Sequence, residues 1–518
     1  MSHGKIILII FALSGMTALV YEIVWIRPLA LVFGTTIYAT SIIIASFLLG
    51  LALGSWIGGK YSDRMNNPLR FYGIVELGIG SYGIMLIPLF STLPYVYVNI
   101  YDITFPDLFL SSVLQFMLAF AIILMPTTLM GATLPLVMRS YSESFGKIGK
   151  DLGRLYSVNN VGAVAGTLAA GFILLPVLGI KQSIITAALI NFSLSIVVLL
   201  LAKTRPELFL TVIVIIVIVL VFAFFVTYDF KALDFGAYFY SFPGLQTSYL
   251  KSFLGEENVK FHKESMYSDV TVFSIEGVDV LKIDGKTECS SSYIDMQNME
   301  MVAVLPYHLF KDNYGNPHSA MIVGLGCGST SRWLSQRVNT TTIEIDPVVV
   351  EASRLYGGKI NQTLIVDDAR NWLLRNNVKF DLILSQPKEP FADQGYLFTS
   401  EYFSLLHSRL TTNGLAAVWV PAYVMNLDDF YTFYNTFHLS FPFVYAYAND
   451  TLTSDVIFIG SNKSLKLDNQ NLVELDKVIS SNKYSLNTDD RPIIEFSTAS
   501  NIYKHNSTAI FEKFSEWK

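Results

Sequence analysis

Two short stretches that carry glycines and acids could together hold a nucleoside. An apolar run from Met321 ends in the turn Gly324-Leu325-Gly326-Cys327-Gly328, and Glu344 ends a second β-forming run twenty residues after Gly324. Glycines let the backbone approach a ligand, and an acid at this distance can bind the ribose hydroxyls. The spacing predicts a nucleoside-binding βαβ unit, with this turn and Glu344 at the ligand.

A third polar strand end follows in the segment LIVDDAR, which supplies Asp368 and Ala369. Beyond residue 300, helix-like segments alternate with short apolar runs at 320–324, 341–345, 363–366, 380–384, 415–420 and 456–460. This alternation predicts a mostly parallel, Rossmann-like α/β sheet with helices on both faces. Ligands bind at the carboxyl ends of such strands, where these candidate residues fall.

The segment before this domain has a different pattern. Residues 258–286 contain β-forming runs separated by Gly277 and by Asp284-Gly285. They predict a small antiparallel sheet made of hairpins.

The N-terminal part of the chain has the composition of a membrane domain. The 518 residues are 52% hydrophobic and 15% charged, whereas a soluble protein carries about 25% charged residues. Runs near or above the ~20 residues that cross a bilayer lie at 6–33, 37–58, 71–90, 111–138, 155–178, 183–202 and 208–228. We therefore expect about seven helices of a multi-pass cell-membrane protein, with 91–110 as a loop or interfacial segment.

These patterns divide the chain into four parts. They are a membrane domain (1–230), a linker with the small sheet (231–300), a nucleoside-binding transferase domain (301–500) and a C-terminal tail (501–518).

Lysine and arginine are unevenly distributed over the predicted loops. The loops after the second, fourth and sixth spans carry Lys60, Arg64, Arg70, Arg139, Lys147, Lys150, Arg154, Lys203 and Arg205, while the opposite loops carry little beyond Lys181. The positive-inside rule therefore places the N-terminus in the cytoplasm. A seventh span would put the C-terminal domain outside, although a cytosolic nucleoside donor would require it inside. The sequence leaves both sides open.

Charged and small residues inside the membrane runs have structural and functional interpretations. Glu22, Arg27 and Glu76 lie in apolar segments, where a charge is costly unless it is paired. Gly50–Arg64 resembles the loop between the second and third helices of major facilitator transporters. Its glycines at every fourth position also fit tight helix packing.

Several classes of ligand find no support in the composition. The net charge of −6 and the lack of a basic stripe give no reason to expect nucleic acid. Two cysteines and seven scattered histidines offer no metal-ligand spacing, so we predict no metal.

The segment from Glu264 to Phe496 resembles the spermidine synthase (polyamine aminopropyltransferase) family, specifically its membrane-fused branch. The matching pieces are Asp284-Gly285-Lys286, Gly324–Gly328, Glu344–Pro347, Asp368–Arg370, Phe380–Pro390, Leu397–Phe403 and Thr488–Phe496. The resemblance implies the fold of S-adenosylmethionine methyltransferases and transfer of an aminopropyl group from decarboxylated S-adenosylmethionine to an amine. It implies Glu344 on the ribose, Asp368 and Ala369 on the adenine, the glycine turn beneath the sulfonium tail, and possible homo-oligomers.

The chain departs from the family at the expected acceptor site. Cys327 replaces an aspartate that holds the aminopropyl amine, and residues 295–304 lack the family's Tyr-His-Glu stretch. Gln386 replaces the first acid of the catalytic loop and cannot act as a base. Glu389 retains one carboxylate and becomes the candidate for amine recognition or proton acceptance. Lys388 beside it would repel a polyamine.

Three hypotheses follow. The first is a membrane-anchored aminopropyltransferase that acts on a small amine. The second is an S-adenosylmethionine-dependent methyltransferase that acts on a lipid or another membrane-proximal acceptor. The third is a non-catalytic nucleoside or polyamine sensor coupled to a transporter-like membrane domain.

Overall fold

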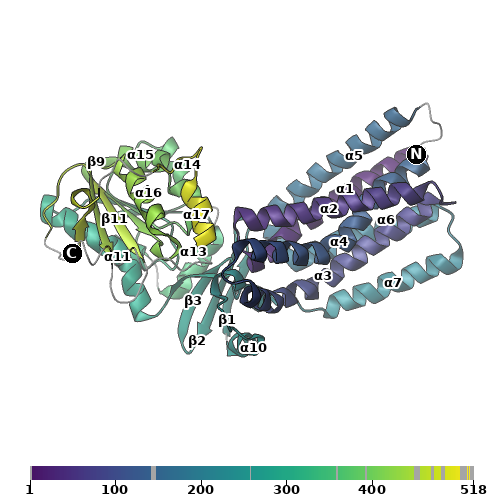
Figure 1. The fold of residues 1–518 in the computed structure, drawn as a ribbon, viewed down its shortest axis with the longest axis horizontal. Helices are drawn as coiled ribbons and strands as arrows, with labels where there is room; N and C mark the ends of the chain where they lie inside the picture. Colours follow the sequence, from purple (N-terminus) through teal and green to yellow (C-terminus); the bar gives the residue numbers. More distant parts are fainter. Residues whose placement is uncertain are drawn as a thin grey trace.

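The structure, a computed structural model, joins a helical bundle to an α/β domain through a small sheet (Figure 1). It describes residues 3–141, 147–256, 258–357, 360–390, 394–448, 455–467, 472–479, 485–501, 510 and 513. The predicted tail, 501–518, lies almost wholly outside the described residues.

The bundle contains long apolar helices. They are α1 (His3–Phe33), α2 (Ile37–Ser62), α3 (Pro68–Thr104), α4 (Leu108–Tyr141), α5 (Ile148–Ala169), the π-helical turn η2 (Ala170–Leu174), α6 (Leu175–Leu201) and α7 (Pro206–Phe225). Within the described part of the chain, six continuous helical stretches are long and apolar enough to cross a membrane, and the fifth runs from Ile148 to Leu201. The expectation of a loop at 91–110 is wrong, because α3 continues through Pro94 to Thr104. Neighbouring helices in a bundle tolerate such a proline.

The fifth stretch changes direction at Gly179, whose backbone has φ 73° and ψ 179°. Packing contacts show that α3 and α5 run parallel to α1, whereas α6 runs antiparallel to α3. The contacts are Phe11 with Tyr72, Tyr21 with Gly83, Ala12 with Gly162, Met16 with Gly166, Leu199 with Gly73, and Phe192 with Gly80. The two halves of the stretch therefore pass along the bundle in opposite directions.

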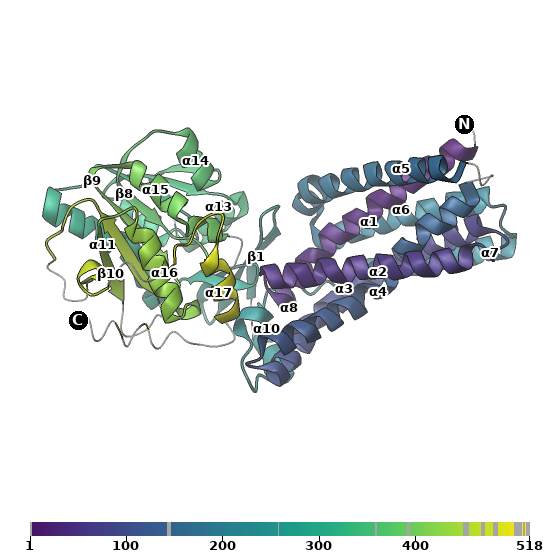
Figure 2. The ribbon, with the colours of Figure 1, turned by 45° about the horizontal axis from the view of Figure 1, so that its top comes forward.

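The two ends of the bundle differ in their neighbours. At one end, Arg139 lies 3.6 Å from Asp63 and the Asn67 side chain donates to the carbonyl of Ala202, so the basic loops lie together near the N-terminus. At the other end, Arg27 donates to the carbonyl of Met266 across 2.5 Å. The basic loops and the α/β domain thus lie at opposite ends (Figure 2).

Three buried polar side chains inside the bundle are paired with one another. Glu76 is fully buried and accepts hydrogen bonds from Ser14 (2.5 Å) and Asn191 (2.6 Å). These bonds join α1, α3 and α6, so the Glu76 carboxylate contributes to packing of the bundle.

The small sheet contains four antiparallel strands in the order β1-β2-β3-β4. They are β1 (Asn258–Glu264), β2 (Asp269–Ile275), β3 (Val278–Ile283) and β4 (Lys286–Ser290). The short helices α8 (Phe230–Leu233), α9 (Ala237–Tyr240) and α10 (Thr247–Glu256) connect α7 to this sheet.

The large sheet contains eight strands in the order β12-β10-β11-β9-β8-β5-β6-β7. They are β5 (Ser319–Val323), β6 (Asn339–Glu344), β7 (Thr363–Val366), β8 (Phe380–Ser385), β9 (Leu410–Val420), β10 (Phe443–Ala448), β11 (Val456–Ser461) and β12 (Leu472–Glu474). The neighbouring strands β9, β8, β5, β6 and β7 are parallel to one another. The strands β11, β10 and β12 extend the sheet beyond β9 with antiparallel pairing. Together with the bundle and the small sheet, this arrangement confirms the predicted fold class.

Two features of this sheet position the site. Alternate residues of β5 enter separate cores on the two faces, which explains its uninterrupted apolar sequence. The chain order also changes direction between β5 and β8, because β6 and β7 lie on one side of β5 and β8 on the other. Ligands bind at the carboxyl ends of strands beside such a switch point.

The glycines of α2 pack directly on α4, so we predict that Gly54→Ala destabilises the bundle. A β-carbon at Gly54 would lie 1.9 Å from the carbonyl oxygen of Thr128, whereas one at Gly59 of the same helix would meet nothing within 4 Å. Forced separation of two packed helices costs about 1–3 kcal/mol. The thermal midpoint in detergent should fall for Gly54→Ala and stay near that of the parent for Gly59→Ala. Equal midpoints would contradict this packing.

The arrangement of the bundle also predicts where reporter fusions lie. Fusions after Lys150 and Arg205 should report one compartment, and a fusion after Lys231 should report the other. A single compartment for all three would show that one of the helical segments does not cross the membrane.

Candidate functional site

The predicted glycine turn connects β5 to α12 (Ser329–Ser335) at the switch point. Gly324, Gly326 and Gly328 all have positive φ angles of 86°, 53° and 78°, a conformation that glycine adopts at little cost. A β-carbon at Gly324 would lie 3.0 Å from the carbonyl oxygen of Gln386, which follows β8. The glycines therefore bring the ends of β5 and β8 close together.

Glu344 holds this turn in place from the end of β6. Its carboxylate accepts hydrogen bonds from the backbone N–H groups of Leu325 (2.8 Å) and Asp346 (3.0 Å), and the residue is 7% exposed. Burial raises the pKa of Glu344, and the two N–H donors oppose that shift. Each oxygen keeps a further lone pair, so the same carboxylate can also accept hydrogen bonds from a ligand.

A cavity of about 100 Å³ connects Glu344 with the other predicted donor-site residues. Asp368, Ala369, Gln386 and Tyr396 also line it. Asp368 caps α14 (Ala369–Arg375) by accepting from the N–H of Asn371 at 2.7 Å, and its second oxygen accepts from the Tyr396 hydroxyl at 3.1 Å. The structure thus brings the predicted strand-end acids to one cavity.

A second cavity of about 240 Å³ adjoins the first. Gly324, Gly326, Glu288, Gln386 and Pro387 line both, and Cys327 and Gly328 line only the second. The glycine turn and the segment after β8 therefore separate two neighbouring binding volumes.

Acidic side chains line this second cavity. They are Glu288, Asp295 and Asp455, with Lys286 as the accompanying base. Within the described structure, Glu288 Oε1 and Asp455 Oδ1 are buried and accept no hydrogen bond. The nearest cation to Glu288 Oε1 is Lys286 Nζ, at 3.6 Å. Burial raises the pKa of Asp455 to about 6 and that of Glu288 above its usual range.

The expected role of Glu389 is not supported by its position. Glu389 is fully buried, lies 2.6 Å from Lys286 Nζ and accepts a hydrogen bond from the Tyr423 hydroxyl. It lines neither cavity, because Lys286 and Tyr423 lie between it and the open volume. Gln386 does line both cavities, as a neutral residue.

Lys388 is also arranged differently from the sequence expectation. Its Nζ lies 3.2 Å from Asp284 Oδ2, so an acid already compensates its charge. Lys388 therefore does not leave the acceptor side positively charged.

Sequence reasoning missed Glu288, Asp295 and Asp455 as site residues. Glu288 lies two residues after the Asp284-Gly285-Lys286 motif, so this motif gave some signal. Asp455 precedes β11, one of the antiparallel strands, and no local motif marks it. The two cysteines also come together: Cys289 and Cys327 are both buried in the wall of the second cavity.

These features define an α/β domain that can hold a nucleoside at a switch point, beside an acidic cavity. Residues 296–463 match the family model described as the spermine/spermidine synthase domain. The chain therefore carries a domain of this family, as its motifs predicted. A bundle of apolar helices precedes this domain in the sequence.

Curated relatives agree with this assignment. The polyamine aminopropyltransferase of Corynebacterium efficiens is 24% identical over 452 residues, which cover 83% of this chain and 80% of that protein. The spermidine synthase of Dictyostelium discoideum is 26% identical over 183 residues, 33% of this chain and 63% of the relative. The polyamine aminopropyltransferase of Thermoplasma volcanium matches at 29% over 150 residues, about half of its length (52%). A crystal structure of spermidine synthase from Thermotoga maritima is 19% identical, covers 46% of this chain and 84% of that one, and has a TM-score of 0.36.

The contacts of Glu344 predict a double effect of Glu344→Gln. The two backbone N–H groups bond to different oxygens of the carboxylate, and the amide replaces one of these oxygens with an NH₂ donor. The glycine turn should therefore loosen, and a nucleoside should lose a charged partner. Each charge-assisted bond contributes about 1.5–3 kcal/mol, so calorimetry should show at least tenfold weaker binding of methylthioadenosine, together with a lower thermal midpoint. Glu351→Gln, on the exposed face of the neighbouring helix α13 (Pro347–Ser353), is the matched control. Parent-like nucleoside binding by Glu344→Gln would contradict the assignment.

Proposed function

We propose that this chain is a membrane-bound aminopropyltransferase that uses decarboxylated S-adenosylmethionine and a small aliphatic amine. The observation that carries the proposal is the pair of adjoining cavities: one contains the strand-end acids Glu344 and Asp368, and the other contains Glu288 and Asp455. The family domain at 296–463 supports this assignment of the donor.

In the proposed reaction, the donor and the acceptor occupy adjoining cavities, and the reacting carbon and nitrogen meet where the two cavities join. The adenosine of the donor occupies the smaller cavity, and its aminopropyl chain extends past Gly324 and Gln386 toward the larger one. The acceptor nitrogen forms a bond to the aminopropyl carbon while the carbon–sulfur bond breaks, and its electron pair stays on sulfur to give a neutral thioether. Holding the reacting atoms in line supplies much of the rate enhancement of such a transfer.

The acceptor must also lose a proton, because an ammonium group has no lone pair. Asp455 and Glu288 can bind the incoming ammonium, and a buried carboxylate with a raised pKa is a suitable proton acceptor near neutral pH. Gln386 at the shared wall can orient the amine by hydrogen bonding. The acids that the family carries in its catalytic loop are thus replaced by an acid from β4 and one directly before β11.

The methyltransferase alternative receives less support from this geometry. Methyl transfer to a neutral lipid acceptor does not require several buried acids beside the sulfonium. The acids of the larger cavity fit a cationic acceptor better.

The loop charges favour a second candidate, a sensor without turnover. A cytoplasmic N-terminal end of the bundle would place the α/β domain outside, away from a cytosolic donor. A reporter after Lys231 that reads cytoplasm supports the transferase, and one that reads the exterior supports the sensor.

We predict that Asp455→Asn raises the KM for 1,4-diaminobutane about tenfold or more, with donor binding unchanged, because one charged contact of about 1.5–3 kcal/mol is lost. In the parent, kcat/KM should rise with pH through about 6, since the Asp455 pKa is raised to that value and only the ionised form attracts the ammonium. The variant should lose this rise. Mass spectrometry of the aminopropylated product provides the rates. A parent that binds donor and amine without forming product would exclude the transferase.

A further inference from the structure

A third cavity, of about 290 Å³, lies where the bundle meets the small sheet. The ends of the helices contribute apolar walls through Leu31, Leu175 and Ile180. The sheet contributes three carboxylates, Glu264, Asp269 and Asp284, and α1 contributes Arg27. The cavity therefore combines a hydrocarbon surface with an excess of negative charge.

Asp269 is the unusual group of this cavity. It is 5% exposed, and neither of its carboxylate oxygens accepts a hydrogen bond from any residue that the structure describes. The closest basic atom that pairs with it is His262 Nδ1, at 3.3 Å from Oδ1, and this atom also lies 3.0 Å from Thr271 Oγ1. A buried carboxylate without hydrogen bonds is costly, so a cation in the cavity would stabilise the folded protein.

Arg27 balances the charges around Asp269 only in part, since it opposes the rise that the neighbouring acids cause in the Asp269 pKa. The Arg27 guanidinium donates to the backbone carbonyls of Met266 (2.5 Å) and Ser265 (3.5 Å), and it forms no ion pair within 4.0 Å of a described acid. Burial, with the nearby Asp234, Glu264 and Asp284, raises the pKa of Asp269 well above its usual range.

We propose that this cavity binds a primary alkylammonium group, with the ammonium on Asp269 and the alkyl chain against Leu31 and Leu175. An ammonium offers three N–H donors, which match the two open oxygens of Asp269 and the carboxylate of Glu264. The apolar walls and the volume fit an organic cation better than a bare ion. A metal on Asp234, His262 and Asp269, whose ligand atoms lie within 4.8 Å of one another, is the competing occupant.

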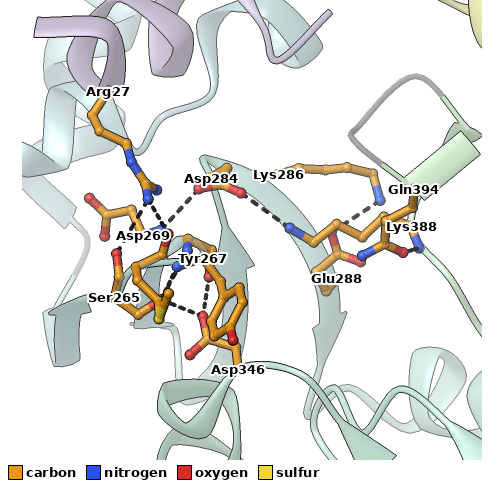
Figure 3. A network of polar contacts seen from close by, with 12 residues as sticks. Arg27, Ser265, Tyr267, Asp269, Asp284, Lys286, Glu288, Asp346, Lys388 and Gln394 are labelled. Atoms are coloured by element: carbon orange, nitrogen blue, oxygen red, sulfur yellow. Dashed lines mark hydrogen bonds and ion pairs between the residues drawn. The ribbon is translucent and has the colours of Figure 1, made fainter. Parts of the chain in front are cut away.

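The site would communicate with the nucleoside cavity through polar contacts (Figure 3). Asp284 accepts from the N–H of Asp269 at 2.9 Å and pairs with Lys388 at 3.2 Å. Ser265, beside Met266 in the loop that Arg27 contacts, donates to Asp346 at 2.6 Å. An occupant of this cavity therefore touches groups that hold both sides of the donor site.

The proposal concerns binding alone and does not depend on turnover. The test uses the full-length protein in phosphatidylcholine nanodiscs, with calorimetry and thermal midpoints measured against 1,4-diaminobutane. We expect two amine sites in the parent, one of which Asp455→Asn weakens about tenfold or more. Asp269→Asn should weaken the other at least tenfold.

Ala30→Phe provides an independent variant, since Ala30 lines the cavity and the ring would fill it without a change of charge. It should remove the same site as Asp269→Asn. Glu276→Gln, at the exposed turn between β2 and β3, should bind as the parent does. Parent-like binding by both Asp269→Asn and Ala30→Phe would overturn the proposal.

The same system can distinguish a soluble amine from a lipid headgroup as the source of the ammonium. A midpoint that 1,4-diaminobutane raises in pure phosphatidylcholine indicates a soluble amine. A rise only when phosphatidylethanolamine is added indicates a lipid headgroup, which supplies the same ammonium. A rise with Mg²⁺ or Mn²⁺ after chelator treatment, but with neither amine source, would overturn the alkylammonium site in favour of a metal.

Discussion

The position of one buried carboxylate constrains most of the α/β domain. Glu344 accepts from the N–H groups of Leu325 and Asp346, and thereby fixes the glycine turn against the end of β6. This glycine turn also approaches Gln386 and separates the two cavities. Asp346, two residues further on, accepts from Ser265 and Ser268 of the small sheet. A ligand on Glu344 would therefore join an arrangement that already connects both sheets.

The acidic groups of the larger cavity, the proposed acceptor site, illustrate how a site can keep its charge while its motif changes. Gln386, where the resemblance implies a catalytic acid, is neutral, and Glu389 forms an ion pair with Lys286 and accepts a hydrogen bond from the Tyr423 hydroxyl. Glu288, in β4 of the small sheet, and Asp455, directly before β11 of the large sheet, supply carboxylates at the cavity instead. What matters for a cationic acceptor is the field inside the cavity, and acids from any element can produce that field.

The sequence predicted those features that depend on local order. The alternation of apolar runs with helix-like segments identified six of the eight strands of the large sheet, but it missed β10 and β12. The glycine turn with Glu344 and Asp368 identified one cavity, because strand ends in a parallel sheet converge. The missed residues depend on contacts between distant segments: Asp455 lies beside the cavity only because β11 joins next to β9. Glu389 seemed free in the sequence, since nothing local shows that Lys286, more than a hundred residues earlier, pairs with it. The extent of α3 was missed because proline is a weak terminator among packed helices.

The junction between bundle and sheet follows from the same electrostatic reasoning. Arg27 is costly inside an apolar run, and its place near the end of α1 lets the guanidinium reach the carbonyls of the loop before β2. Glu264 likewise accepts from the N–H of Ile180, directly after the reversal at Gly179. The bundle thus supplies hydrogen-bond donors for backbone carbonyls of the small sheet's loop, and the small sheet supplies a carboxylate for a backbone N–H group at the end of the bundle. This reciprocity favours a fixed orientation of the α/β domain on the bundle over a flexible attachment, and it makes the acids around Asp269 part of the junction itself.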